Sequence, residues 1–308
     1  MSASPLLIGH QSDTHLRTIY EQLRKRGCSP VVVDADSIGE IGYQLTPTRL
    51  CIGGVELSSD ERGWLRRIAP TRWTTGETVG SVGDVTFRAR VRLIAAIARQ
   101  PDRQWLTGID ALQRAEDRLY QLATASRLGI ATPTTVIGTN ADQILKSVGN
   151  DAIVKPLATG AYIGSDDRPH AVHTTALTHE VAAQGDFAAA PFVVQQRIHT
   201  QQHLRVVTAG TTVRTASLDA QHWPLDWRTA DAAHTSWKPH TCSPDIEAAA
   251  LRLARELDLG YSSQDWLTQD SGPAVFIDLN PAGQWLFLPS ETADPITDQI
   301  VGFLAGTT

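Results

Sequence analysis

Residues 261–288, YSSQDWLTQDSGPAVFIDLNPAGQWLFL, decide how the rest of the chain is interpreted. They predict a hairpin, because two apolar runs flank the turn-forming sequence TQDSGP. If the strands pair symmetrically about a turn between Ser271 and Gly272, Asp265 lies directly opposite Asp278, with the Cβ atoms roughly 4.5–5.5 Å apart. Two carboxylates at that separation repel each other and destabilise the fold unless a cation compensates them.

The second strand adds an amide oxygen to this pair of carboxylates. Asp278 and Asn280 are two residues apart, so their side chains point to the same face of the strand. Two carboxylates and an amide are hard oxygen donors, which suit Mg²⁺. The predicted metal ligands are therefore Asp265, Asp278 and Asn280. The alternative is a surface hairpin with scattered acids, which we favour less because Asp278 interrupts the apolar run AVFIDL.

The composition describes a globular protein. The chain has 308 residues, of which 42% are hydrophobic and 19% charged. A net charge of −6 argues against a general nucleic-acid-binding protein. No apolar run approaches the roughly 18 residues of a membrane span, and no signal-peptide pattern opens the chain, so we expect a cytoplasmic protein without a membrane partner. The three cysteines form no C-x-x-C motif, which supports neither a disulfide framework nor a zinc site.

The N-terminal part predicts a parallel sheet. An apolar run over 5–9, a helix that Asp13 can cap, and the run PVVVD over 30–34 form a β-α-β pattern. No glycine fingerprint follows the first strand, so a dinucleotide-binding fold is not expected. Further helices are expected at 86–99, 110–128 and 244–259, and hairpins at 49–57 and 204–218.

The helix over 86–99 carries Arg88, Arg92 and Arg99 on one face, with no acid between Asp84 and Asp102. We favour a solvated arginine face, and a docking strip for an acidic peptide is the alternative.

The C-terminal hairpin resembles a known family. Asp265, followed thirteen residues later by acid-x-Asn-Pro, resembles the metal-binding end of the ATP-grasp ligases. The string DLNPAGQWLFL is similar to one branch of them, the graspetide (microviridin-type) synthetases that macrocyclise ribosomal peptides. This family usually has Glu where the chain has Asp278, which keeps the charge on a shorter arm. LGIATPTT before AIVKP also resembles the start of the ATP-grasp domain. The resemblance is close from about residue 105 onward and loose before it.

The resemblance implies an α/β fold of the ATP-grasp type in three parts. These are an N-terminal parallel-sheet domain over 1–105, a small central lid domain over 106–190 and a C-terminal antiparallel-sheet domain over 191–308. ATP is expected between the last two.

The resemblance also implies a set of nucleotide ligands. Lys155 ends the strand AIVKP before the glycine-containing loop 159–167, and is expected to bind the α- and β-phosphates. Arg118 stands where the family has a lysine that touches phosphate; only four of the chain's 27 Lys and Arg residues are lysine, so composition alone can explain this replacement. The hinge strand that reads adenine through its backbone corresponds to Gln195, Gln196, Arg197 and Ile198. Thr200 and His203 replace a family Lys and acid, which leaves the ribose contact open.

Three further residues are expected to act on the reacting groups. Arg205 matches the family arginine that faces the transferred phosphoryl group. Asp226 and Arg228 match a D-x-R motif of the peptide-cyclising branch, in which the arginine would orient the acceptor carboxylate.

The implied function is ATP- and Mg²⁺-dependent carboxylate ligation. The enzyme would join Asp or Glu side chains of a ribosomal precursor peptide, made of a leader and an acidic core, to Thr, Ser or Lys side chains through an acyl phosphate. One alternative is an ATP-grasp ligase that adds a free amino acid to a carboxylate acceptor. Another is an inactive nucleotide- or peptide-binding relative. The oligomeric state stays open, with a homodimer as one expectation.

Overall fold

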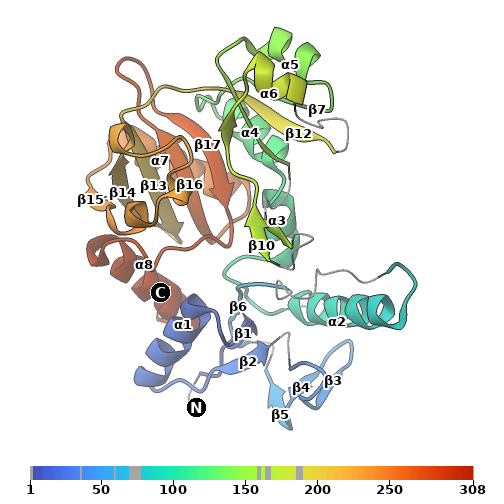
Figure 1. Cartoon of the computed structure of the whole chain (residues 1–308). Coiled ribbons are helices and arrows are strands. Elements are labelled where there is room, and N and C mark those ends of the chain that lie inside the picture. Colours follow the sequence, from blue (N-terminus) through green and yellow to red (C-terminus); the bar gives the residue numbers. More distant parts are fainter. Residues whose placement is uncertain are drawn as a thin grey trace.

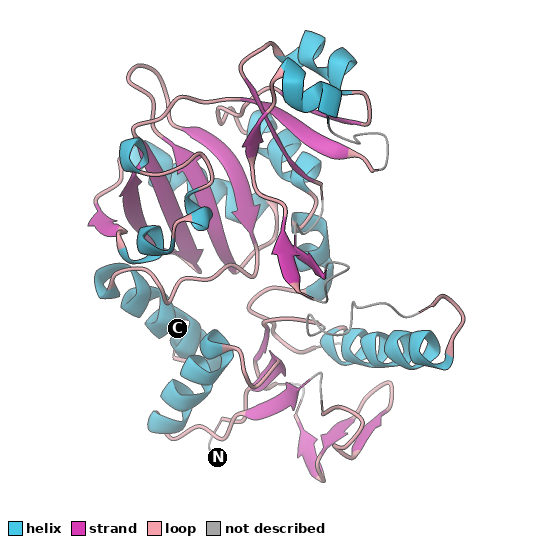
Figure 2. Ribbon diagram, in the orientation of Figure 1, coloured by secondary structure: helices cyan, strands magenta, loops and turns pink. Residues whose placement is uncertain are grey.

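In the described part of the chain, five sheets of two to five strands and the helices around them make up the fold (Figure 1). The computed structural model describes residues 3–34, 37–58, 60–68, 78–100, 102–157, 161–163, 168–184 and 190–307. Parallel strands lie near the N-terminus, and the middle and the end of the chain contain antiparallel sheets with helices packed against them (Figure 2). The expected α/β class is therefore confirmed. Within the described ranges, no helix combines the length and the apolar character that crossing a membrane requires.

The N-terminal unit opens with the predicted β-α-β pattern. β1 (Leu6–Gly9) and β2 (Val31–Asp34) pair in parallel, and α1 (Thr14–Lys25) connects them. Asp13 caps α1 by accepting from the N–H groups of His15 and Leu16, as an N-cap carboxylate does. The remaining elements are β3 (Tyr43–Leu45), β4 (Leu50–Ile52), β5 (Val55–Leu57), β6 (Gly63–Leu65), which extends the parallel sheet, and α2 (Val82–Ala98).

Helix α2 starts four residues before the predicted 86–99. Ser81 caps it by accepting from the N–H group of Asp84. Arg88 binds Asp84 across one turn at 2.8 Å, and Arg99 binds Asp110 at 3.0 Å. Because two of the three arginines of this face have partners within the chain, the contacts favour an arginine face over a docking strip.

The middle of the chain contains two helices where one was predicted over 110–128. α3 (Ile109–Ala115) ends before Asp117, whose carboxylate accepts from the N–H group of Tyr120 and so starts α4 (Arg118–Arg127). The single-helix prediction was wrong because this capping aspartate lies inside a continuous apolar pattern. The elements that follow are β7 (Thr135–Gly138), α5 (Ala141–Val148), β8 (Ala152–Pro156), β9 (Ala161–Ile163), β10 (Pro169–Ala171), β11 (Thr175–Ala176), α6 (His179–Gln184) and β12 (Phe192–Gln196).

Strand β12 belongs to the central sheet, whose strand order is β11-β8-β12-β7. It pairs with both β7 and β8, although the expected boundary between the central and C-terminal domains lay at 190/191. We therefore propose that the central domain extends through Gln196.

The C-terminal sheet has the order β15-β14-β13-β16-β17 and is antiparallel throughout. Its elements are β13 (Gln202–Ala209), β14 (Thr212–Asp219), η2 (Ala220–His222), η3 (Trp227–Thr229), η4 (Asp231–Thr235), β15 (Lys238–His240), α7 (Pro244–Glu256), β16 (Tyr261–Leu267), β17 (Val275–Asn280) and α8 (Ser290–Ala305). Helix α7 ends earlier than the predicted 259, because Asp258 adopts a left-handed φ of 59°. Gly260 does not end the helix but allows a close approach of two backbone segments, since a Cβ there would lie 1.7 Å from the carbonyl oxygen of Leu106.

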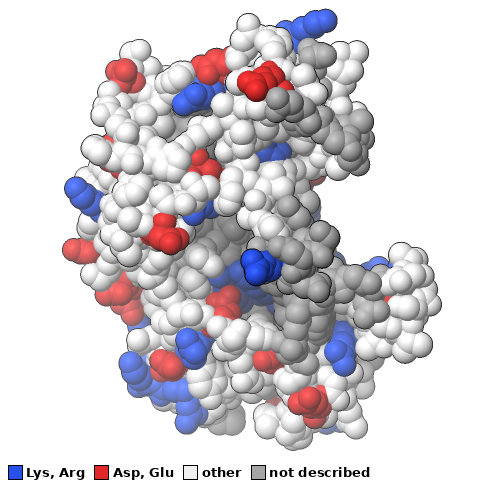
Figure 3. All heavy atoms as spheres, in the orientation of Figure 1, with Lys and Arg blue, Asp and Glu red and all other residues white. Residues whose placement is uncertain are grey.

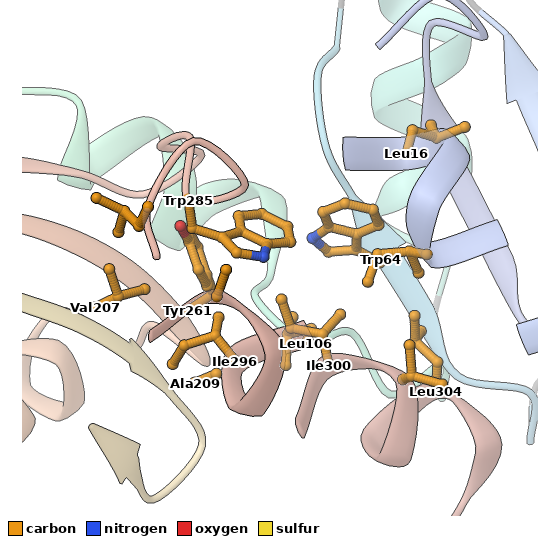
Figure 4. Packing of buried hydrophobic residues seen from close by; sticks show 14 of the residues in the cluster. Leu16, Trp64, Leu106, Val207, Ala209, Tyr261, Trp285, Ile296, Ile300 and Leu304 are labelled. Carbon is orange, nitrogen blue, oxygen red and sulfur yellow. The ribbon is translucent and has the colours of Figure 1, made fainter. Parts of the chain in front are cut away.

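One apolar core joins the two ends of the chain. Trp285 is fully buried at its centre, and Trp64 of the N-terminal unit packs against it with ring centroids 6.1 Å apart (Figure 4). Ile296 and Ile300 of α8 belong to the same cluster. Helix α8, which the sequence interpretation did not include, lies beside α1 and covers β13 and β14. The N-terminal unit is thus packed firmly onto the C-terminal sheet.

Candidate active site

A cleft of about 610 Å³ lies between the central and the C-terminal sheets. Eleven of the twelve predicted site residues line it. They are Arg118, Lys155, Gln195, Gln196, Arg197, Ile198, Asp226, Arg228, Asp265, Asp278 and Asn280. The twelfth, Arg205, is buried and binds Asp265 with 3.0 Å between Nη1 and Oδ1.

Strand alternation explains how β13 and β16 serve both the core and the cleft. On one face of β13, Leu204 and Val206 pack into the cluster that contains α7. The opposite face carries Arg205 at the cleft and, further along, Val207 in the core with Trp285. Asp265 of β16 is the partner of Arg205 in the sheet register, so arginine and carboxylate meet on the same face.

A β-bulge turns Asp278 toward the cleft. Asp265 pairs with Asp278 as predicted, but the register shifts next to them, and Trp266 pairs with Phe276. The symmetric turn assumed from the sequence is therefore wrong by one residue. Phe276 and Leu279 both face the core with α7, although they are three residues apart. The extra residue re-aims the strand, so that Ile277 and Asp278 line the cleft.

Both carboxylates of the pair have arginine partners. Arg118 Nε lies 3.2 Å from Asp278 Oδ1, and Arg228 Nη2 lies 3.7 Å from Asp265 Oδ2. Burial raises the pKa of Asp278, but the charges of Arg118 and Lys155 outweigh burial and hold it below its usual value. The like-charge repulsion expected from the sequence is thus already compensated by the protein.

Arg118 also connects the two walls of the cleft. Its Nη1 donates to the carbonyl oxygen of Pro156 at 2.9 Å, at the end of β8, while its Nε contacts Asp278 on β17. Nearby, burial lowers the pKa of Lys155 to about 8, although Asp278 attracts the ammonium group. Parts of the predicted glycine-containing loop 159–167, namely residues 159–160 and 164–167, lie outside the described residues.

Asp226 holds the guanidinium of Arg228 at the mouth of the cleft. Asp226 Oδ1 lies 3.3 Å from Arg228 Nη1, and its Oδ2 accepts from the N–H group of Thr174 at 3.0 Å. The Cζ atom of Arg228 lies 5.4 Å from the Trp227 ring centroid. The sequence gave no sign of Thr174, because it comes from the β10–β11 loop, about fifty positions away.

The predicted hinge leaves one amide for a ligand. The N–H groups of Gln196 and Arg197 donate to the carbonyl oxygens of Thr134 and Asp151, both at 2.9 Å. The Ile198 amide has no acceptor within the described part of the chain. His203 lines the same cleft, and burial lowers its pKa, so that it stays neutral more readily.

The cleft is positively charged although the chain is acidic. Its lining includes four Lys or Arg side chains and three Asp side chains, whereas the whole chain has a net charge of −6. Figure 3 shows how Lys, Arg, Asp and Glu side chains are distributed over one face of the molecule. Such a site attracts anions.

The donor set fits Mg²⁺ on chemical grounds. Across the described residues, no three His, Cys, Asp or Glu side chains form a cluster that could hold a metal ion. A metal here would therefore rest on two carboxylates and the Asn280 amide, with its shell completed by phosphate and water, which is how Mg²⁺ is commonly bound.

Gln121 of α4 holds the strand that carries the predicted metal ligands Asp278 and Asn280, and sequence reasoning missed it. Its side chain is buried and forms two hydrogen bonds with Leu279, accepting from the N–H group at 2.9 Å and donating to the carbonyl at 2.7 Å. It also donates to the carbonyl of Ala115 at 2.6 Å. Leu279 lies between Asp278 and Asn280 on β17, the edge strand of the sheet. The side chain of Gln121 therefore makes the two backbone hydrogen bonds that a further strand would otherwise make there. A polar residue inside an apolar helical pattern was the available signal.

The fold is similar to those of solved ATP-grasp ligases. No protein-family model matches the chain, and no curated protein matches it. Among solved structures, the macrocyclase MdnC bound with precursor peptide MdnA, from Microcystis aeruginosa MRC, is 19% identical at a TM-score of 0.82, and the match covers 98% of this chain and 99% of that chain.

Two further structures agree with this similarity. A RiPP-associated ATP-grasp ligase of Chryseobacterium gregarium, in complex with ADP and a leader and core peptide, is 19% identical at a TM-score of 0.85, covering 99% and 97% of the two chains. The ATP-grasp ligase PsnB complexed with a minimal precursor, Mg and ADP is 17% identical at a TM-score of 0.76, covering 98% of both. The chain therefore has the ATP-grasp fold.

Proposed function

We propose that this protein is an ATP-dependent carboxylate ligase that forms ester or amide crosslinks between side chains of a ribosomal precursor peptide. The observation that carries the proposal is the convergence of Arg205 and Arg228 on Asp265, opposite Asp278, inside a basic cleft. Neighbours of the same fold were solved with nucleotide and with precursor peptides, which supports the same substrates here.

The reaction would proceed in two steps. An oxygen of the substrate carboxylate attacks the γ-phosphorus of ATP, giving an acyl phosphate and ADP. A hydroxyl or amine of the same peptide then attacks the carbonyl carbon, phosphate leaves, and the nucleophile loses its proton. Catalysis of such a reaction depends mainly on positioning and on stabilising charge as it moves.

The nucleotide would lie across the two sheets. Of the hinge residues Gln195, Gln196, Arg197 and Ile198, the Ile198 amide would bind adenine, because the amides of Gln196 and Arg197 already bind carbonyl groups within the chain. Lys155 and Arg118 would bind phosphate oxygens. Because Arg118 already contacts both walls of the cleft, phosphate binding there would also fix the central domain relative to the C-terminal sheet.

Mg²⁺ held by Asp265, Asp278 and Asn280 would supply charge neutralisation at the phosphates. Arg205 would face the transferred phosphoryl group from beneath, where Asp265 and Ser263 orient it.

Arg228 would orient the acceptor carboxylate. Its guanidinium is held by Asp226 on one side and stacked on Trp227, and about half of its side-chain surface is exposed to the cleft. A planar guanidinium in a fixed orientation can bind a carboxylate with two parallel hydrogen bonds. The basic cleft further supports an acidic core peptide as the substrate.

The test is co-expression of the protein with short peptides encoded beside its gene, chosen for acidic residues and for Thr, Ser or Lys. We expect a peptide to lose the mass of one water per ring, and to keep its mass when Asp278→Ala replaces the parent. Transfer of a free amino acid to the acceptor, with no water lost from a peptide alone, would support the amino-acid ligase instead.

Two finer expectations accompany the proposal. The cysteines are free, which suits the reducing cytoplasm. A homodimer stays a prediction, which light scattering of the purified protein would test.

A further inference from the structure

A buried polar cluster of the N-terminal unit contacts the loop that follows Asn280. The cluster consists of Asp13, His15 and Arg66, all with side chains no more than about a tenth exposed. The loop, residues 281–286, connects the predicted metal ligand to Phe287. None of the three cluster residues lines the cleft.

The cluster binds the loop through four backbone groups. Arg66 Nη1 donates to the carbonyl oxygens of Ala282 and Gly283. His15 Nε2 accepts from the N–H groups of Trp285, at 3.0 Å, and Leu286, at 3.3 Å. The N-terminal unit thus supplies a donor at one end of the loop and an acceptor at the other.

These bonds define the tautomer of His15. Because Nε2 accepts, the ring proton is on Nδ1, which lies 3.4 Å from Asp13 Oδ1. Asp13 in turn contacts Arg66 Nε at 3.2 Å and Arg67 Nε at 3.6 Å. Burial lowers the pKa of His15, against the hydrogen bond to Asp13, which agrees with a neutral ring.

The far end of the loop contacts the residues proposed to handle the phosphoryl group. The Phe287 ring centroid lies 6.0 Å from Arg205 Cζ and 6.3 Å from the centroid of Trp227, on which Arg228 stacks. Gly283 packs so tightly on β16 that a Cβ there would lie 2.5 Å from the Cβ of Ser263, whose hydroxyl accepts from Arg205. A shift of this loop would therefore move the surroundings of Arg205.

We infer that Asp13, His15 and Arg66 are positioning residues of the ligase site, which hold loop 281–286 so that Asn280 and Phe287 stand correctly around Arg205. The inference rests on the proposed function only for its effect on catalysis. The N-terminal unit then sets the geometry of a cleft that it does not line.

Four variants distinguish a role in positioning the loop from a general contribution to the stability of the fold. His15→Leu removes the acceptor, His15→Gln offers a neutral amide oxygen in its place, and Arg66→Lys keeps the charge but loses the fork. The matched control is His222→Gln, because His222 also faces an aspartate, Asp219 at 3.0 Å, but is exposed. Hydrogen exchange of the full-length protein reports the loop directly, and ATP turnover with the co-expressed peptide reports the site.

We expect amides over 282–287 to exchange about tenfold faster or more in His15→Leu, since two buried N–H groups lose their acceptor. Exchange in β12 of the central sheet should stay unchanged. The kcat of His15→Leu and Arg66→Lys should fall at least about tenfold with little change in KM for ATP, because the loop that they release surrounds Arg205, which is proposed to act on the phosphoryl group in the transition state. His15→Gln should recover most of the slow amide exchange and most of the kcat, and His222→Gln should match the parent in both.

The pH dependence of the free energy of unfolding gives a second test. A protonated His15 would present a proton to two N–H groups, so the parent should lose stability relative to His15→Gln as the pH falls through about 6.5, the usual pKa of histidine. Asp13, Arg66 and Arg67 are the charged groups around the ring.

The outcomes are distinct. Unchanged exchange over 282–287 in His15→Leu would overturn the inference, and so would faster exchange with an unaltered kcat. If the parent binds no nucleotide, the proposed function fails, while the exchange data still decide whether the cluster holds the loop.

Discussion

Replacing Gln121 by Leu should damage the predicted metal site from outside the cleft. The substitution is close in size but removes the two hydrogen bonds to Leu279 and the one to Ala115. A buried backbone group left unpaired costs about 1–3 kcal/mol, so the two groups of Leu279 predict a loss of about 2–4 kcal/mol in the free energy of unfolding after partial relaxation. Because Leu279 lies between Asp278 and Asn280, affinity for Mg²⁺ with a nonhydrolysable ATP analogue should also fall, by about tenfold.

Gln264→Leu is the matched control for this prediction. Gln264 is buried in the same sheet and donates to the carbonyl of Ala250 at 2.9 Å while it accepts from Trp266 at 3.1 Å. Its side chain lies on the α7 side, away from the cleft. Gln264→Leu should therefore lose comparable stability and keep its nucleotide affinity.

Urea unfolding would give the stability change, and calorimetry would give the affinity for Mg²⁺ and analogue. The reasoning would be refuted if both variants lost affinity equally, or if Gln121→Leu lost stability and bound the nucleotide like the parent.

Three further substitutions test the cleft itself. Asp278→Ala should abolish ligation and, because Arg118 and Lys155 lower the pKa of Asp278, should also destabilise the nucleotide-free protein by about 1–2 kcal/mol at pH 7. This difference should persist down to about pH 4, the usual pKa of an aspartate, and shrink only as the pH falls further, which acid-dependent urea unfolding measures. Lys155→Met should raise the melting temperature without nucleotide, because burial, which lowers the pKa of Lys155 to about 8, makes the charged ammonium costly in the folded protein. This gain should shrink as the pH rises from about 8 to 10.5, since the folded parent then holds a neutral lysine. With Mg·ATP, the rise in melting temperature should be smaller in Lys155→Met than in the parent. Arg228→Lys should lose ligation, measured by mass spectrometry, and retain ATP affinity, measured by calorimetry; loss of both would assign Arg228 to the nucleotide site.

The sequence predicts well the features that depend on local patterns. Asp13 was predicted to cap a helix and does so, and AIVKP forms β8 with the predicted bounds. The opposition of Asp265 and Asp278 followed from turn symmetry. This predicted pairing is correct only because the β-bulge before Asp278 compensates for a one-residue error in the predicted position of the turn.

Features made by contacts across the chain could not be read from the sequence. Gln121 appears there as one polar residue in a helix, and its function depends on Leu279 being at a sheet edge. The partnership of Asp226 with Thr174 and that of His15 with Trp285 join segments 52 and 270 positions apart. Resemblance supplied the residues of the cleft, and only the fold shows which distant groups hold them.

The most direct measurement of the central claim follows the oxygen of the substrate carboxylate. The co-expressed peptide, with its Asp and Glu carboxylates carrying a heavy oxygen isotope, is incubated with the purified protein and Mg·ATP. Ligation through an acyl phosphate predicts that each ring formed yields one ADP and one inorganic phosphate that contains one labelled oxygen. Ring formation with unlabelled phosphate, or with AMP and pyrophosphate in place of ADP and phosphate, would contradict it.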